Sequence, residues 1–419
     1  MERINYLIAL FLLLISSPLW AENRPLNLAE CFELAKNFHE SIPLAVEDIK
    51  QVQARLTQTV GAITPQISFK FTETIQEKAS HSGELETFTR QFRPELSLTL
   101  TQPIFHGLIE FYAIKKLKYE KREKTWLKKE AERALFINVA ESYYRVVFLE
   151  RNITTTGHIL SVLREQLAEL IEWKNLGKVR DAEMVRQQAT VALLEADLSK
   201  LKSERNVAYE VLGYLTGLNP QPKILIQSPL QEKIKPLAEY LHLSANRSDV
   251  QAAALRAKMA ESAVKMAKGE FFPKVDLEAN YYPYRVGFLS NIDWDVTLNA
   301  KIPLLKLDNF GKLKEAKSKN LQEQLRKQQQ ERSAQNDIRQ AYTQLMGTLN
   351  QLKKYQQAVY LAKKTYDLLK ADVRLGQATQ LEILQAQKQW LDASWQRDQA
   401  EIQAWQAYTL LKLHVGVFE

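Results

Sequence analysis

The chain has little of the chemistry on which most enzymes and metal sites depend. Among 419 residues it has one cysteine, six histidines without HxxxH or HExxH spacing, 13 glycines and 13 prolines. A single cysteine excludes a disulfide framework and a four-cysteine metal site, and so few glycines and prolines exclude collagen-like and low-complexity classes. The motifs GxGxxG, GxxxxGKS/T and GxSxG are absent. The sequence therefore gives no support for an enzyme, a cofactor or a bound metal.

Long apolar runs are confined to the start of the chain. Arg3 precedes an almost unbroken apolar stretch over residues 4–15, and the small Ala21 offers a cleavage point. This order predicts a secretory signal peptide over residues 1–21; the alternative, a membrane anchor, is disfavoured because the stretch is short for a span. No apolar run of 18 residues follows, so we expect an exported chain without a transmembrane helix. The lone Cys31 lies in a helix-like pattern and is expected to be a small buried hydrophobe.

Proline is missing from two long parts of the chain. None occurs between residues 104 and 219 or between 304 and 419, and both parts are rich in Ala, Leu, Glu, Lys, Gln and Arg. Because proline is nearly excluded from helix interiors and these residues favour helices, both parts are predicted to form long helices. A helix over about 108–173 would be roughly 100 Å long and would need partners along its length.

The second half of the chain repeats the pattern of the first. We predict two repeats, residues 22–218 and 237–419, each with a helix, two strands and long helices, joined by a linker over 219–236. Four pairs of segments carry the repeat: Leu28-Ala-Glu with Leu237-Ala-Glu, Thr64-Pro65 with Phe272-Pro273, Gln102-Pro103 with Ile302-Pro303, and Leu176-Gly177 with Leu375-Gly376.

Between these prolines, apolar and polar residues alternate. The alternation covers residues 67–72, 95–100, 275–281 and 292–302, which predicts four strands with one apolar face each. Strands of about ten residues can cross a bilayer; the alternative is two hairpins packed on the helices. A sheet in hydrocarbon must close, and four strands are too few, so a membrane location requires several chains to share one barrel. Aromatic residues near the strand ends suit a membrane interface: Phe271, Phe272, Tyr281, Tyr282, Tyr284 and Phe288.

Six motifs stand in a fixed order: Leu26-Asn-Leu-Ala-Glu, Thr64-Pro-Gln, Asn246-Arg-Ser-Asp-Val, Phe272-Pro-Lys, Val373-Arg-Leu-Gly and Leu381-Glu-Ile. With the order of elements, they resemble the TolC-like outer-membrane factor (outer membrane efflux protein) family over about residues 26–416. The resemblance implies a mainly α-helical fold with a membrane β-barrel: a long coiled-coil tunnel, and four transmembrane strands per chain that complete a trimeric 12-stranded barrel. It implies a homotrimer in the cell outer membrane with a periplasmic extension, acting as the passive exit duct of a tripartite efflux pump or type I secretion system. Its partners would be a periplasmic adaptor (membrane fusion protein), an inner-membrane pump and outer-membrane lipid.

The two Leu-Gly pairs and the acids that follow them are the candidate working parts. Each pair lies between two long helices, where a glycine with positive φ is expected; the alternative is a helix end with no further role. The resemblance assigns to the periplasmic tips that dock an adaptor Leu176, Gly177, Arg180, Arg374, Leu375 and Gly376.

A carboxylate lies six residues after each glycine, and the resemblance assigns Glu183 and Glu382 to a periplasmic gate. In a trimer each would form a ring of like charges, which selects cations; the alternative is a glutamate that the helix dipole favours at a helix start. Two positions depart from the family pattern, Gln385 in place of a second acid and Ala378 in place of a basic residue.

The remaining features favour no other partner. A basic run over residues 115–129 is interleaved with acids and is expected to be a solvated helix face rather than a site for nucleic acid or anionic lipid. Trp390, Trp395 and Trp405 stand at helical spacings and are expected to pack between helices. The competing function is a soluble periplasmic coiled-coil adaptor or scaffold, which would usually show one helical hairpin flanked by small β domains.

Overall fold

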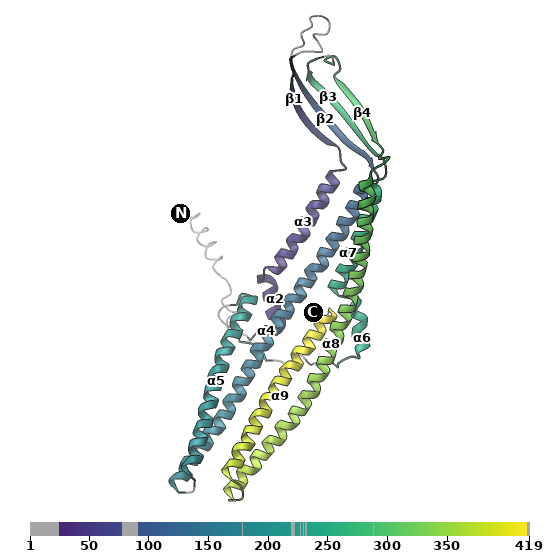
Figure 1. The fold of residues 1–419 in the computed structure, drawn as a ribbon. Helices are drawn as coiled ribbons and strands as arrows, with labels where there is room; N and C mark the ends of the chain where they lie inside the picture. Colours follow the sequence, from purple (N-terminus) through teal and green to yellow (C-terminus); the bar gives the residue numbers. More distant parts are fainter. Residues whose placement is uncertain are drawn as a thin grey trace, which may run out of the picture. The chain divides into compact units, whose positions relative to one another are not determined.

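The computed structural model describes most of the chain as long helices and one small sheet (Figure 1). The predicted signal peptide lies outside the described residues, as does Phe288. No helix among the described residues is long and apolar enough to span a membrane. The described residues are 25–77, 91–177, 179–218, 223–226, 228, 230, 233–287 and 289–416.

The elements occur in two sets that follow the same order. The first set is α2 (Leu28–Phe38), α3 (Ser41–Gly61), β1 (Gln66–Ile75), β2 (Phe92–His106), α4 (Ile109–Asn175) and α5 (Asp181–Thr216). The second is α6 (Leu237–Leu243), the short helix η2 (Ser244–Asn246), α7 (Ser248–Gly269), β3 (Lys274–Arg285), β4 (Trp294–Lys301), α8 (Leu307–Arg374) and α9 (Gln380–Val415). Helices α4 and α8 have 67 and 68 residues, so the predicted long helices are confirmed.

The chain divides into two compact units, and each unit takes segments from both repeats. One unit comprises Met1–Pro43, Glu130–Arg247 and Ala334–Glu419, and contains α2, α5, α6, α9 and most of α4 and α8. The other comprises Leu44–Lys129 and Ser248–Ser333, and contains the sheet, α7, most of α3 and the first parts of α4 and α8. The compact units therefore cut across the repeats, because each long helix begins in one unit and ends in the other.

The four predicted strands form one antiparallel sheet in the order β1-β2-β3-β4. The register aligns side chains of one kind in rows, and the row Phe69–Leu98–Tyr281–Trp294 is apolar and exposed. The opposite face carries the row Ser68–Thr99–Asn280–Asp295, in which Thr99 Oγ1 donates to Asn280 Oδ1 at 2.7 Å. One face of the sheet is thus apolar and the other is hydrogen-bonding and polar, as period-two alternation predicts.

Strand β2 is longer than the alternation predicted. It spans Phe92–His106 rather than residues 95–100, and it includes Pro94 and Pro103. The register with β3 shifts between Pro103 and Phe105, where a residue without a backbone N–H interrupts the ladder. Pro103 therefore marks an irregularity within the strand and not its end.

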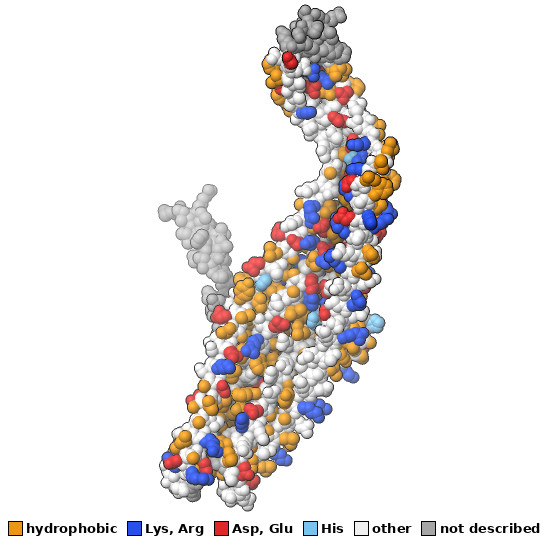
Figure 2. All heavy atoms as spheres, in the orientation of Figure 1, with side chains coloured by type: hydrophobic (Ala, Val, Ile, Leu, Met, Phe, Trp, Pro, Cys, Tyr) orange, Lys and Arg blue, Asp and Glu red, His pale blue; other side chains and the backbone are white. Residues whose placement is uncertain are grey.

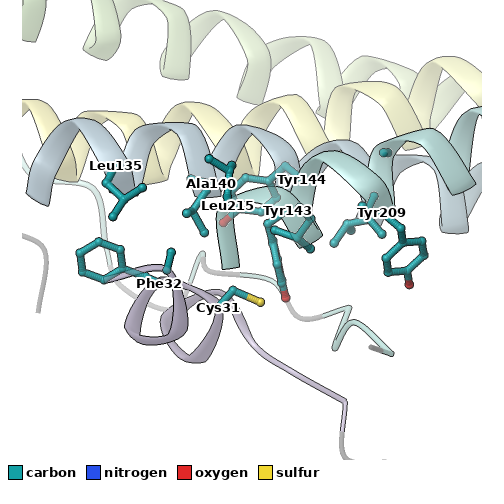
Figure 3. Close-up of a cluster of buried hydrophobic side chains, with 14 of the residues drawn as sticks. Cys31, Phe32, Leu135, Ala140, Tyr143, Tyr144, Tyr209 and Leu215 are labelled. Atoms are coloured by element: carbon teal, nitrogen blue, oxygen red, sulfur yellow. The ribbon is translucent and has the colours of Figure 1, made fainter. Parts of the chain in front are cut away.

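The core of the first unit joins helices from both ends of the sequence. Phe32 of α2, labelled in Figure 3, stacks on Phe136 of α4 with ring centroids 4.3 Å apart, and Trp405 of α9 is buried in the same cluster. Cys31 is fully buried there, and burial raises the pKa of its thiol to about 12, so it is the buried hydrophobe that the sequence predicts. Trp390 stacks on Tyr366 at 5.5 Å. The predicted packing of the tryptophans between helices is confirmed.

Candidate functional site

The turn between α4 and α5 is built on a left-handed glycine. Helix α4 ends at Asn175, and the Gly177 N–H then donates to the Lys174 carbonyl at 2.8 Å. Gly177 has φ of 72°, as the sequence predicts for a chain reversal. Leu176, just before it, leaves 67% of its surface exposed, although it is large and apolar.

The turn between α8 and α9 repeats this geometry. The Gln377 N–H donates to the Asp372 carbonyl at 2.8 Å and the Gly376 N–H to the Val373 carbonyl at 3.0 Å, which together form a Schellman motif. Gly376 has φ of 74°, and Leu375 leaves 71% of its surface exposed. A Cβ on Gly177 or Gly376 would meet no atom within 4 Å, so the backbone conformation and not lack of space requires glycine.

Glu382 lies in the first turn of α9 and takes part in the cap of that helix. Its carboxylate accepts hydrogen bonds from the Thr379 N–H at 2.7 Å and the Thr379 hydroxyl at 2.8 Å. The Glu382 N–H donates back to Thr379 Oγ1 at 3.4 Å, which completes a capping box. The hydrogen bond from the Thr379 backbone, followed by that from its hydroxyl, holds the pKa of Glu382 below its ordinary value. This carboxylate is therefore already engaged at its own helix N-terminus.

Glu183 lies in a different setting at the start of α5. Arg180 is the N-cap residue and makes no side-chain cap hydrogen bond. Its guanidinium lies 3.5 Å from the Glu183 carboxylate, and Lys174 Nζ lies 2.8 Å from Asp181. The structure therefore groups Arg180 with Glu183 and Thr379 with Glu382. Arg374 is the last residue of α8.

A buried polar network behind the tips was not predicted from the sequence. The Gln166 amide donates to the Tyr366 hydroxyl at 3.1 Å and its carbonyl accepts from Gln387 at 2.8 Å and from Gln187 at 3.4 Å. These four residues, which we call the Gln166 network, come from α4, α5, α8 and α9, and all are at most 4% exposed. A glutamine on the buried stripe Leu163-x2-Gln166-x3-Leu170 was the available signal.

The comparisons with known proteins agree on one family. Residues 241–417 match the family model described as outer membrane efflux protein. The outer membrane protein TolC of Vibrio cholerae is 21% identical over 399 residues, which are 91% of this chain and 87% of that protein. Residues 241–417 therefore belong to the outer membrane efflux protein family, and the chain is similar to that TolC protein over nearly its whole length.

Two further proteins are similar to this chain over nearly its whole length. The pyoverdine export outer membrane protein OpmQ of Pseudomonas putida is 22% identical over 408 residues, which are 93% of this chain and 86% of that protein. The crystal structure of the outer membrane protein VceC from Vibrio cholerae matches with a TM-score of 0.80 at 19% identity, over 94% of this chain and 97% of that chain. This efflux protein therefore has the mainly helical outer-membrane channel fold, and its location is the outer membrane.

Proposed function

We propose that three copies of the chain share one twelve-stranded barrel in the outer membrane, continued by the helices as a periplasmic tunnel. The observation that carries this proposal is the sheet with two unpaired edges, β1 and β4, and one exposed apolar face. Neighbouring strands are antiparallel throughout, so β1 and β4 run in opposite directions. Pairing β4 of one copy with β1 of the next therefore continues the antiparallel ladder and removes both edges.

Cysteine cross-linking between the two edge strands tests this closure. Single cysteines are placed along β1 (Ser68→Cys, Lys70→Cys) and β4 (Thr297→Cys, Asn299→Cys), and the β1 and β4 variants are combined in pairs. Cys31 is fully buried, so it adds little background. We expect one register of pairs to link membrane-extracted protein into covalent trimers that resist heating. Recovery of the chain as a monomer from the aqueous periplasmic fraction would overturn the shared barrel.

We propose further that the duct is a passive exit for a tripartite efflux pump or a type I secretion system. An adaptor would dock at the hairpin tips, on the exposed Leu176 and Leu375 beside Gly177 and Gly376. Arg180 and Arg374 would flank these contacts. Leu176→Asp with Leu375→Asp is expected to abolish export in cells and to leave the trimer intact on unheated gels. Unchanged export would contradict docking at these leucines.

We propose that Glu183 and Glu382 line the gate that an adaptor or pump opens. Three copies would bring each glutamate into a ring of carboxylates, which attracts cations and disfavours anions. Glu183→Gln with Glu382→Gln is expected to shift the reversal potential of single channels in a salt gradient toward lower cation preference. Glu239→Gln on α6 removes the same charge outside the tips and is the control. A double variant that is as cation-selective as the control would exclude both residues from the gate.

A further inference from the structure

The first turns of α4 and α8 carry the same four residues at the same spacing. Leu108-x2-Phe111-x3-Lys115-x2-Lys118 at the start of α4 corresponds to Leu307-x2-Phe310-x3-Lys314-x2-Lys317 at the start of α8. Positions i, i+3, i+7 and i+10 lie on one face of a helix. Leu307 begins α8, whereas Leu108 has φ of 62° and lies one residue before α4, so the helical positions on α4 are Phe111, Lys115 and Lys118. Each of the two helices therefore presents one stripe, apolar at the end near the sheet and cationic beyond it, which we call the leucine-to-lysine stripe.

The apolar ends of both stripes are exposed. Leu108 and Phe111 leave 52% and 60% of their surfaces uncovered, and Leu307 and Phe310 leave 75% and 58%. Further large apolar side chains are exposed beside β4, among them Leu304 at 92%. On the face drawn in Figure 2, hydrophobic side chains gather where the helices begin, next to Lys and Arg side chains.

The acidic residues beside the stripes lie off them and are already paired, beginning with Glu110, which pairs with His106 at 2.8 Å. On α4, Glu120 pairs with Arg55 at 2.7 Å and Glu123 with Arg256 at 2.8 Å. On α8, Asp308 pairs with Lys312 at 2.7 Å. Glu315 pairs with Lys319 at 2.5 Å. Among the residues that the structure describes, no ion pair or hydrogen bond reaches the four lysines of the stripes, and three of them are exposed: Lys118, Lys314 and Lys317.

The stripes begin at the end of the sheet from which the helices start. His106 of β2, Lys274 of β3 and Lys301 of β4 form the last row of the sheet at that end. Leu108 and Leu307 follow within a few residues of β2 and β4. Along a helix, a lysine four residues beyond a phenylalanine is displaced by about 6 Å and one seven residues beyond it by about 10 Å. The headgroup layer on one side of a bilayer is roughly 5–8 Å thick, and a lysine side chain can extend its ammonium group toward it.

We propose that the two leucine-to-lysine stripes bind the periplasmic leaflet of the outer membrane, with Leu and Phe in its hydrocarbon edge and the lysines on anionic phospholipid headgroups. The inference rests on the membrane barrel proposed above. A second copy of the chain fits these stripes less well than lipid does. Contact between the stripe of α8 on one copy and the stripe of α4 on the next would bring lysine against lysine, because both stripes have the same pattern.

This inference revises part of the expectation from the sequence. The basic run over residues 115–129 was expected to be a solvated face because acids interleave with it. The structure separates the two charges around the helix: the acids face α3 and α7 through Arg55 and Arg256, and Lys118 stays unpaired on the stripe. The charge that counts for a membrane surface is that of the exposed face alone.

Depth-dependent quenching locates the apolar ends of the stripes. Phe111→Cys and Phe310→Cys in the full chain are labelled with an environment-sensitive fluorophore and reconstituted into vesicles of phosphatidylethanolamine and phosphatidylglycerol that contain lipids with a quencher on the acyl chain. Val296→Cys on the apolar face of the sheet is the positive control, and Thr125→Cys, farther along the α4 stripe, is the negative one. We expect strong quenching at residues 296, 111 and 310 and little at 125.

The outcomes separate the two proposals. Quenching at 296 without quenching at 111 and 310 would overturn the stripe and leave the barrel standing, whereas no quenching at 296 would overturn the barrel. Disulfide-linked dimers of the Phe111→Cys or Phe310→Cys variant would show that a neighbouring copy covers these positions. That result would also overturn the contact of the stripes with lipid.

Lysine substitutions test the charged ends. The variant with Lys115→Gln, Lys118→Gln, Lys314→Gln and Lys317→Gln is compared with a control that carries Lys116→Gln and Lys319→Gln on the other faces of the same helices. Detergent-purified protein is titrated with phosphatidylglycerol or phosphatidylcholine, and bound lipid is read by native mass spectrometry. We expect the affinity for phosphatidylglycerol to fall at least about fivefold in the stripe variant, the effect of one lysine at an anionic surface, with phosphatidylcholine unaffected. Equal phosphatidylglycerol binding by the stripe variant and the control would overturn the proposal.

Discussion

The tip between α4 and α5 and the tip between α8 and α9 turn on the same backbone geometry. Gly177 and Gly376 have φ of 72° and 74°, and the leucine before each glycine is exposed by 67% and 71%. The helices that follow begin differently. Helix α9 has a capping box between Thr379 and Glu382, whereas the N-cap residue of α5, Arg180, makes no side-chain cap hydrogen bond.

The comparison shows that the turn requires a glycine at both tips, whereas the helix start does not require a side-chain cap. Both tips need a residue that accepts a positive φ, and both use glycine. The orphan N–H groups at a helix start can be satisfied by a side chain or by water. The glutamate six residues after each glycine can therefore either cap its own helix or interact with another group. Glu382 is engaged in a cap and Glu183 in an exposed ion pair. Of the two proposed gate residues, Glu183 is therefore the one whose charge is less committed to its own backbone.

The largest expected effect comes from breaking the network that joins the two hairpins. Gln166→Leu would leave the buried amides of Gln187 and Gln387 and the Tyr366 hydroxyl without the hydrogen bonds that Gln166 makes. We expect a loss of about 2–3 kcal/mol in the free energy of unfolding, because buried polar groups without partners retain their desolvation cost. Thermal unfolding followed by circular dichroism in detergent measures it.

An exposed position provides the control for this substitution. Gln399→Leu on α9 makes the same chemical change at an exposed residue and should stay within about 0.5 kcal/mol of the wild type. Equal effects of the two substitutions would mean that the network adds no stability.

The next effect tests whether the two turns are equivalent. Gly177→Val and Gly376→Val each force a β-branched residue into the left-handed region, which costs about 1–2 kcal/mol. Because a Cβ meets no atom within 4 Å at either site, the cost should be nearly the same at both. Asparagine tolerates positive φ, so Gly177→Asn and Gly376→Asn should recover much of the loss. Unequal melting temperatures for the two valine variants would show that the tips differ in their turns as well as in their caps.

Removing the capping box, which only the tip between α8 and α9 has, is expected to have a smaller effect on stability. Thr379→Ala removes both hydrogen bonds of the Thr379 hydroxyl and is expected to cost about 1 kcal/mol. The pKa of Glu382 is lowered by folding, so its contribution is present above the ordinary value of 4.5 and is lost as the pH falls through the lower folded value. The difference in melting temperature between wild type and Glu382→Gln should therefore shrink on acidification below about pH 4.5. A difference that grows on acidification would contradict the cap.

Much of the fold could be predicted because local rules determine it. The absence of proline between residues 104 and 219 predicted α4, and alternation predicted the strands, because both patterns act within one element. The Gln166 network depends on which faces of four helices meet, and no local pattern records that. The ends of β2 were missed for a related reason: a proline can lie in a strand where the register shifts, and the shift is a property of the pair of strands.

The candidate site shows the same limit. The local alternative for Glu382 was a glutamate that the helix dipole favours at a helix start, and the structure places it there in a capping box with Thr379 that the sequence analysis did not identify. The assignment of Glu183 and Glu382 to a gate depends on how copies assemble, so it stays a prediction. The duplicated spacing of the stripes on α4 and α8 was missed in the sequence analysis, and only the structure showed which acids were already paired.

The smallest expected effect concerns the tip without a cap. Arg180 is 88% exposed and its guanidinium lies 3.5 Å from Glu183, and an exposed pair of this kind contributes about 0.2–1 kcal/mol at most. Arg180→Gln should lower the unfolding free energy by only about 0.3 kcal/mol, and the effect should vanish in high salt because exposed charges are screened. If Arg180 instead contacts an adaptor, the same variant would reduce export far more than it reduces stability. A loss of stability that persists in high salt would mean that Arg180 supports the turn itself, and the two tips would then be alike in needing a fixed side chain at the helix start.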